Sequence, residues 1–234
     1  MDVYLIPFSA DRHQLYCEPS ADADTEGDGD ARGTGLFDRT MERVRRMLVR
    51  LDVPDEAPHQ APPRTWHGRA RRRVARWTAA KVAEQRLLWR LRRIASARVF
   101  FPDDLTEAEA SATVQRLLRR DADRHRRWMV VHLVALVPAV FVLGPIFLIV
   151  PGVANLPAVY FGFRAFGHFL SMQGARNGLK NVTWTYAPSD ALTALRHLDT
   201  LRRPERARRI DEVAARLGLT SFSRFCKRTA LWGA

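Results

Sequence analysis

The chain has 234 residues, of which 38 are Lys or Arg and 25 are Asp or Glu, so its formal net charge is +13. Such an excess suggests nucleic acid or an anionic membrane as the partner. Cys17 and Cys226 are the two cysteines, which excludes a disulfide scaffold, and a hydrophobic content of 47% excludes disorder along the whole chain.

Residues 1–127 are predicted to form a basic, mostly helical cytoplasmic region that begins with a β-hairpin. Residues 3–6 form a β-type run ended by Pro7, and residues 14–17 are its candidate partner strand. Two linkers follow, one acidic and Gly-rich over 19–35 and one with four prolines over 54–64. Between these linkers, apolar residues at helical spacing predict an amphipathic helix over 36–51.

Two further helices are predicted before the apolar centre of the chain. A basic helix over 66–97 either lies on anionic lipid or is a solvated helix that packs one face on the domain. Thr106 and Glu109 have the spacing of a capping box, which predicts a helix start. This helix is expected to run through Arg127 into the next segment without a break.

Residues 128–171 contain a single charged side chain, Arg164, and are predicted to be a transmembrane helical hairpin. The first span, 128–150, is about 34 Å long as a helix, which exceeds a hydrocarbon core of about 30 Å. The second span, 153–171, follows a bend near 151–157. The alternative is a buried helical hairpin in a soluble protein. Basic residues flank both spans and are absent from the bend.

The positive-inside rule places both termini in the cytoplasm, with anionic lipid at the basic flanks as a partner. Residues 172–234 then form a basic cytoplasmic tail with a strand over 182–186 and helices over 191–197, 205–217 and 221–230. Pro204 and Gly218 bound the middle helix. The predicted fold class is a mostly α membrane protein, a transmembrane helical hairpin with a small α+β cytoplasmic portion.

Polar side chains inside the predicted hairpin are the candidate functional residues, since ionisable groups in a span are costly to bury. Tyr160, Arg164 and His168 lie on one face of the second span, and matching depths across the bend bring His132 within about a turn of His168. The candidates are His132, Asn155, Tyr160, Arg164 and His168. His125 belongs to an Asp-Arg-His triplet that also occurs at 11–13, and is interpreted as a surface residue.

Several classes of function are disfavoured by what the sequence lacks. No Asp or Glu occurs between Asp123 and Asp190, and two spans are too few to enclose an ion pathway, so a homo-oligomer or membrane complex is expected. No nucleophile elbow, phosphate-binding loop or C-x-x-C motif occurs, so no catalytic residue and no cofactor are expected. The scattered histidines predict no metal site. Residues 202–209 resemble a helix-turn-helix, but a cytoplasmic tail requires the same charge, so no nucleic acid is expected.

One long pattern resembles the mitochondrial K⁺/H⁺ exchange-related family, in particular its bacterial members. The residues that carry the resemblance are Arg120, Asp121, Asp123, Arg124, His125, Trp128, Pro151, Asn155, Pro157, Tyr160, Arg164, His168 and Gly174, with the stretches MDVYLIPFSADRHQLYCE and FFPDDLTEAEA. The resemblance implies an integral membrane protein associated with potassium and proton homeostasis. We therefore expect a non-enzymatic component or regulator of potassium/proton exchange. The alternatives are a membrane scaffold or assembly factor and, less favoured, a nucleic-acid-binding protein.

Overall fold

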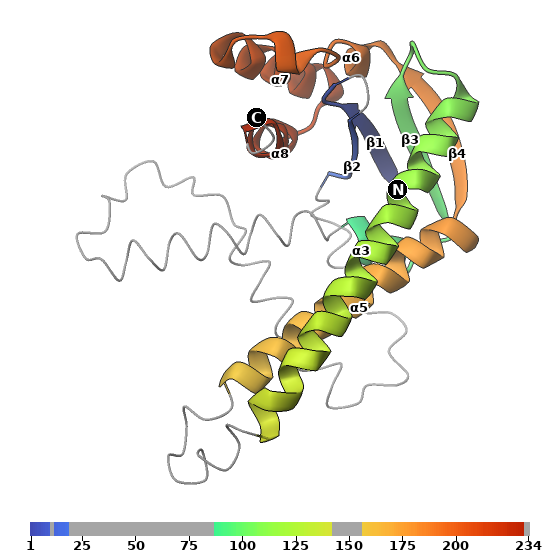
Figure 1. Ribbon diagram of the computed structural model, residues 1–234. Coiled ribbons are helices and arrows are strands. Elements are labelled where there is room, and N and C mark those ends of the chain that lie inside the picture. Colours follow the sequence, from blue (N-terminus) through green and yellow to red (C-terminus); the bar gives the residue numbers. More distant parts are fainter. Residues whose placement is uncertain (10–11, 19–86, 142–155, 232–234) are drawn as a thin grey trace, which may run out of the picture. The chain divides into compact units, whose positions relative to one another are not determined.

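The computed structural model describes residues 1–9, 12–18, 87–141 and 156–231, which form an α+β structure around a mixed four-stranded sheet (Figure 1). Both predicted linkers, the predicted helix over 36–51, residues 66–86 of the predicted basic helix and residues 142–155 lie outside the described residues.

The sheet has the strand order β2-β1-β3-β4. Its strands are β1 (Asp2–Pro7), β2 (His13–Tyr16), β3 (Ser96–Pro102) and β4 (Thr183–Ser189). β1 and β2 are antiparallel, which confirms the predicted N-terminal hairpin. β3 is parallel to both β1 and β4, and Val99 lies opposite Val3 on one side and Tyr186 on the other. The predicted strand at 182–186 is confirmed as β4, and it joins the same sheet through β3.

The prediction of one helix through residue 97 is wrong at its C-terminal end. The helix ends at Leu91, a turn follows, and β3 begins at Ser96. Ala97, Val99 and Phe101 are buried on one side of β3, so the period of two that defines a half-buried strand replaces the helical period here.

Both faces of the sheet are covered, which explains why β1 reads as a continuous apolar run. Val3 and Leu5 point into one core with β3, α3 and α5, whereas Tyr4 and Ile6 point into a second core with the C-terminal helices. The C-terminal helical elements are α6 (Asp190–Thr193), the 3₁₀ turn η3 (Leu198–Thr200), α7 (Arg203–Leu217) and α8 (Phe222–Leu231). Figure 1 shows α3 and the group α6–α8 on either side of the strands.

α7 begins and ends where the sequence predicts. Pro204 lies in its first turn, where a missing N–H costs nothing, and Gly218 ends it in the left-handed conformation with φ of 66°. Glu18, at the end of β2, accepts hydrogen bonds from Thr220 Oγ1 at 2.7 Å and from the Ser221 backbone N–H at 2.8 Å. These bonds fix the start of α8 to the sheet.

The long helices α3 (Glu107–Phe141) and α5 (Leu156–Lys180) lie side by side and antiparallel (Figure 1). The predicted capping box is confirmed: the Thr106 N–H donates to Glu109 Oε2 at 2.9 Å, and the Glu109 N–H donates to Thr106 Oγ1 at 3.3 Å. These bonds from Thr106 lower the pKa of Glu109. The helix continues unbroken past Arg127 and Pro138, as predicted for its first part.

The helix pair forms the connection between two adjacent parallel strands. β3 ends five residues before α3 begins, and α5 ends three residues before β4 begins. Both helices are therefore attached to the sheet at one end of the pair.

The described helical residues 87–91 fix α5 further by packing across it. Trp89 Nε1 donates to Ser171 Oγ at 3.0 Å, and Asn177 Nδ2 donates to the Leu91 carbonyl at 2.7 Å. Gly174 lies between these two bonds and allows the close approach. The sheet-proximal half of α5 is thus held from two directions.

None of the helices in the described ranges meets the combination of length and apolar character that a membrane crossing requires. The two predicted spans stay predictions.

Candidate functional site

Three buried histidines meet between α3 and α5, and they form the most distinctive polar group in the described part of the helix pair. His125 and His132 are seven residues apart on α3, so both face α5 after two helical turns. His168 of α5 lies between them, with ring centroids 5.1 Å from each. We call His125, His132 and His168 the imidazole cluster.

Hydrogen bonds restrict the protonation states of the cluster. His125 Nδ1 lies 2.8 Å from His168 Nδ1, so one of these nitrogens carries a hydrogen and the other accepts it. His132 Nδ1 lies 2.7 Å from the Trp128 carbonyl, which can only accept, so His132 carries its hydrogen on Nδ1. These partners fix the tautomer of His132 and require one hydrogen to be shared between the Nδ1 atoms of His125 and His168.

The cluster can take up protons at specific atoms. In the His125–His168 pair, a further proton can bind Nε2 of the donating ring without breaking the shared bond, whereas protonation of the accepting Nδ1 would break it. His132 can bind a proton at Nε2, since its Nδ1 already donates to Trp128. Histidine is the side chain whose ordinary charge change falls between pH 5 and 8. The arrangement can therefore hold protons at defined atoms and share one between His125 and His168.

Aromatic side chains surround the imidazoles. The Trp128 ring is stacked on His168 with centroids 6.4 Å apart, and Phe161 lies 6.2 Å from His132. No group of three or more metal-ligating side chains in the described ranges is arranged to hold a metal ion. The cluster is thus an imidazole site in aromatic surroundings.

The structure brings together only some of the residues proposed from the sequence. His132 and His168 are in contact, as depth matching predicts. Arg164 is partly buried on α5, one turn before His168, whereas Tyr160 is half exposed and its ring lies against Phe161 at 5.4 Å. Asn155 lies outside the described residues.

Sequence reasoning missed His125. Its Asp-Arg-His triplet suggested a surface cluster, but its side chain is buried. The signal that could have identified it is its spacing of seven residues from His132, which places both on the same face of one helix.

Around and beyond the cluster, the helix pair exposes a band of large apolar side chains. The band begins at Trp128 and includes Val134, which is 64% exposed, and Phe141, which is 74% exposed. The large apolar residues exposed in the described ranges are Trp128, Val130, Val131, Leu133, Val134, Val137, Val140, Phe141, Tyr160, Phe163 and Phe169. We call this set the apolar band. Patches of this extent mark contact with a membrane or another protein.

These features define a class of protein: an α+β domain whose parallel-strand connection is a long antiparallel helix pair, with a buried imidazole cluster next to an exposed apolar band. The chain belongs to the mitochondrial K⁺–H⁺ exchange-related family, whose model matches residues 2–182. The matched region contains β1, β2, β3 and both long helices, and it ends just before β4. No curated protein and no solved structure matches the chain.

Proposed function

We propose that this chain is a membrane-inserted, non-enzymatic component or regulator of potassium/proton exchange. In this proposal α3 and α5 enter the bacterial inner membrane, both termini lie in the cytoplasm, and the imidazole cluster is the proton-responsive element. The observation that carries the proposal is the hydrogen-bonded imidazole cluster at the base of the apolar band.

The apolar band supports the membrane part of the proposal. Large apolar side chains are exposed on both helices around and beyond the cluster. This part of the pair extends away from the sheet (Figure 1). Full burial of a side chain of this size contributes about 1.5–3 kcal/mol, and in water each residue of the band forgoes part of it. Lipid contact removes that cost.

The attachment of both helices to one sheet supports a common side for the two tails. β3 leads into α3 and β4 follows α5, so the chain enters and leaves the helix pair at the same end. Arginines gather at that end on α3, and Arg176 and Lys180 lie there on α5. This distribution matches the positive-inside rule.

The imidazole cluster supports the proton-linked part. Carriers of protons or cations usually use intramembrane carboxylates, and residues 124–189 contain none. The imidazoles are consequently the side chains in this region that we propose to bind and release protons, at the atoms that their hydrogen bonds define. A chain with a proton-binding site and no carboxylate pathway fits a component or regulator better than a complete carrier.

A membrane scaffold or assembly factor is the second candidate. The attachment of the helix pair to a sheet with helices on its other face favours it, because this architecture can hold a partner at a fixed distance from the membrane. Under this alternative the imidazoles stabilise the contact between α3 and α5 and exchange no protons.

Potassium-driven pH changes in everted membrane vesicles distinguish the two candidates. His168→Gln keeps hydrogen-bonding capacity but cannot bind a proton, and His197→Asn is the matched control at an exposed position with a positive φ that Asn tolerates. We expect His168→Gln to abolish the pH change that depends on this protein and His197→Asn to retain it. Unchanged pH responses in both variants, at equal protein levels in the membrane, would overturn the proton-linked role.

A further inference from the structure

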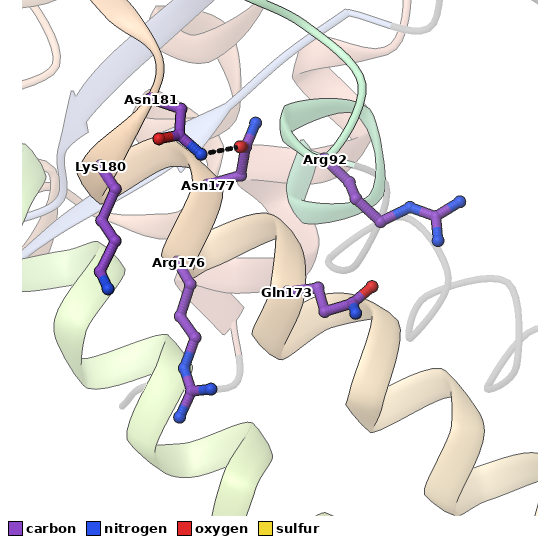
Figure 2. Close-up of a pocket in the computed structure, with 6 residues that line it drawn as sticks. All are labelled: Arg92, Gln173, Arg176, Asn177, Lys180 and Asn181. Carbon is purple, nitrogen blue, oxygen red and sulfur yellow. Dashed lines mark hydrogen bonds between the residues drawn. The ribbon is translucent and has the colours of Figure 1, made fainter.

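An open pocket of about 270 Å³ lies where the Leu87–Leu91 segment passes the C-terminal part of α5 (Figure 2). Its lining residues are Arg92, Gln173, Arg176, Asn177, Lys180 and Asn181. Three of the six are cations, the other three are amides, and none is acidic. We call this site the basic pocket.

The polar groups of the pocket are held by a short chain of hydrogen bonds. Asn177 Nδ2 donates to the carbonyls of Leu91, at 2.7 Å, and Ile94, at 3.4 Å, on either side of Arg92. Asn181 Nδ2 donates in turn to Asn177 Oδ1 at 2.7 Å (Figure 2). The segment that carries Arg92 is therefore fixed against the helix that carries the other two cations.

Arg176 and Lys180 are four residues apart, and Figure 2 shows their side chains extending in the same direction from α5. Like charges at this spacing destabilise a helix by about 0.2–0.5 kcal/mol. Lys180 also lies in the last turn of α5, where a cation is favourable, but Arg176 lies a full turn earlier. A bound anion would remove the repulsion between the two side chains.

The backbone at Arg176 lies near the outer edge of the headgroup layer and the backbone at Lys180 lies beyond it, so the side chains must reach back toward the phosphates. This placement relative to the membrane rests on the proposed function, in which the second span ends at residue 171. At about 1.5 Å per residue, Arg176 lies roughly 7 Å and Lys180 roughly 13 Å beyond that point. Headgroups add about 5–7 Å on each side of the hydrocarbon core, and long basic side chains bend back toward it.

We propose that the basic pocket binds a phosphate group, with Arg176 and Lys180 as its charged donors. Guanidinium groups match phosphate with paired N–H donors, and an ammonium adds a point charge. The phosphate belongs to the headgroup of an anionic phospholipid in the cytoplasmic leaflet or is a free phosphate.

Native mass spectrometry of the full chain in neutral detergent tests the proposal. The probes are phosphatidylglycerol, phosphatidylcholine and inorganic phosphate, each added alone. The test variant is Arg176→Gln/Lys180→Gln. The control is Arg203→Gln/Arg209→Gln, which removes the same charge from exposed positions of α7, on the opposite face of the sheet.

We expect phosphatidylglycerol to bind in preference to phosphatidylcholine, and the test variant to bind it about 25-fold more weakly, at about fivefold for each cation lost. The control should bind as the unsubstituted chain does. If inorganic phosphate binds as well as the lipid and is lost in the same variant, the site is one for free phosphate. If the test and control variants bind all three probes equally, there is no phosphate site in the pocket.

The result is separable from the proposed function because the measurement needs no bilayer. Lipid binding can fail in a protein that inserts normally, and then only the pocket proposal is lost. Conversely, phosphate binding that depends on Arg176 and Lys180 would stand even for a chain that does not enter the membrane.

Discussion

Gly174→Ala should destabilise the protein more than its size suggests, because two backbones meet at this position. A Cβ at residue 174 would lie 1.6 Å from the Leu88 carbonyl oxygen and 2.5 Å from its carbonyl carbon. Ordinary contacts begin at 3.4 Å, so the Leu87–Leu91 segment would have to retreat by about 1.8 Å, the difference between the two distances. Since backbone atoms are on both sides of the clash, no rotamer change can relieve it.

Moving residues 87–91 away from α5 lowers the free energy of unfolding, because it disturbs buried side chains and hydrogen bonds. Leu88 and Leu91 are almost fully buried, and the bonds from Trp89 to Ser171 and from Asn177 to Leu91 hold the segment in place. Overpacking costs about 1–3 kcal/mol, and each weakened hydrogen bond adds about 0.5–1.5 kcal/mol. Alanine recovers up to about 1 kcal/mol of helix propensity. We expect a net loss of about 3 kcal/mol in the free energy of unfolding.

Thermal unfolding of the full chain in detergent, followed by far-UV circular dichroism, measures this loss. For a chain of this length, about 3 kcal/mol lowers Tm by roughly 6–12 °C. Gly167→Ala is the matched control, because it lies on the same helix and a Cβ there meets nothing within 4 Å. Equal melting of the two variants would refute the close approach of the Leu87–Leu91 segment to α5.

Two further predictions concern the C-terminal helices. Glu18→Ala should lower the free energy of unfolding by about 2–3 kcal/mol in denaturant titrations, since it removes charge-assisted bonds to Thr220 and Ser221. The control Glu212→Ala loses an exposed ion pair with Arg208 and should cost under about 1 kcal/mol. Equal costs would contradict the anchoring role of Glu18. Burial raises the pKa of the Cys226 thiol, so iodoacetamide should modify Cys226 only after unfolding, as judged by mass spectrometry; rapid labelling of the native chain would show that α8 is not packed on the sheet.

The elements predicted correctly are those with local signals. The β1–β2 hairpin follows from an apolar run ended by Pro7, and α7 is bounded by Pro204 and Gly218, whose backbone preferences act at the position itself. The sequence does not predict β3, because its partner β1 lies 96 residues earlier in the chain and strand formation there depends on that pairing. The Arg98 side chain also interrupts the apolar pattern.

In the candidate site, too, the sequence predicts some contacts and not those that depend on packing between distant segments. The contact between His132 and His168 followed from the expected antiparallel register of two helices. His125 could have been found from its spacing of seven residues from His132, whereas the basic pocket could not, because it depends on details of packing. The pocket requires the Leu87–Leu91 segment to cross α5, and its position is fixed by Gly174 and Asn177.

The proposed function depends most on the entry of α3 and α5 into a bilayer. A spin label at Val134→Cys, a strongly exposed position in the apolar band, tests this in the full chain reconstituted in lipid vesicles. The control label is at Gln115→Cys, an exposed position of α3 near the sheet, and both native cysteines are buried. We predict that oxygen relaxes the label at residue 134 strongly and that a water-soluble nickel complex does not, with the reverse at residue 115. Equal access of the nickel complex to both labels would contradict the entry of α3 and α5 into the bilayer.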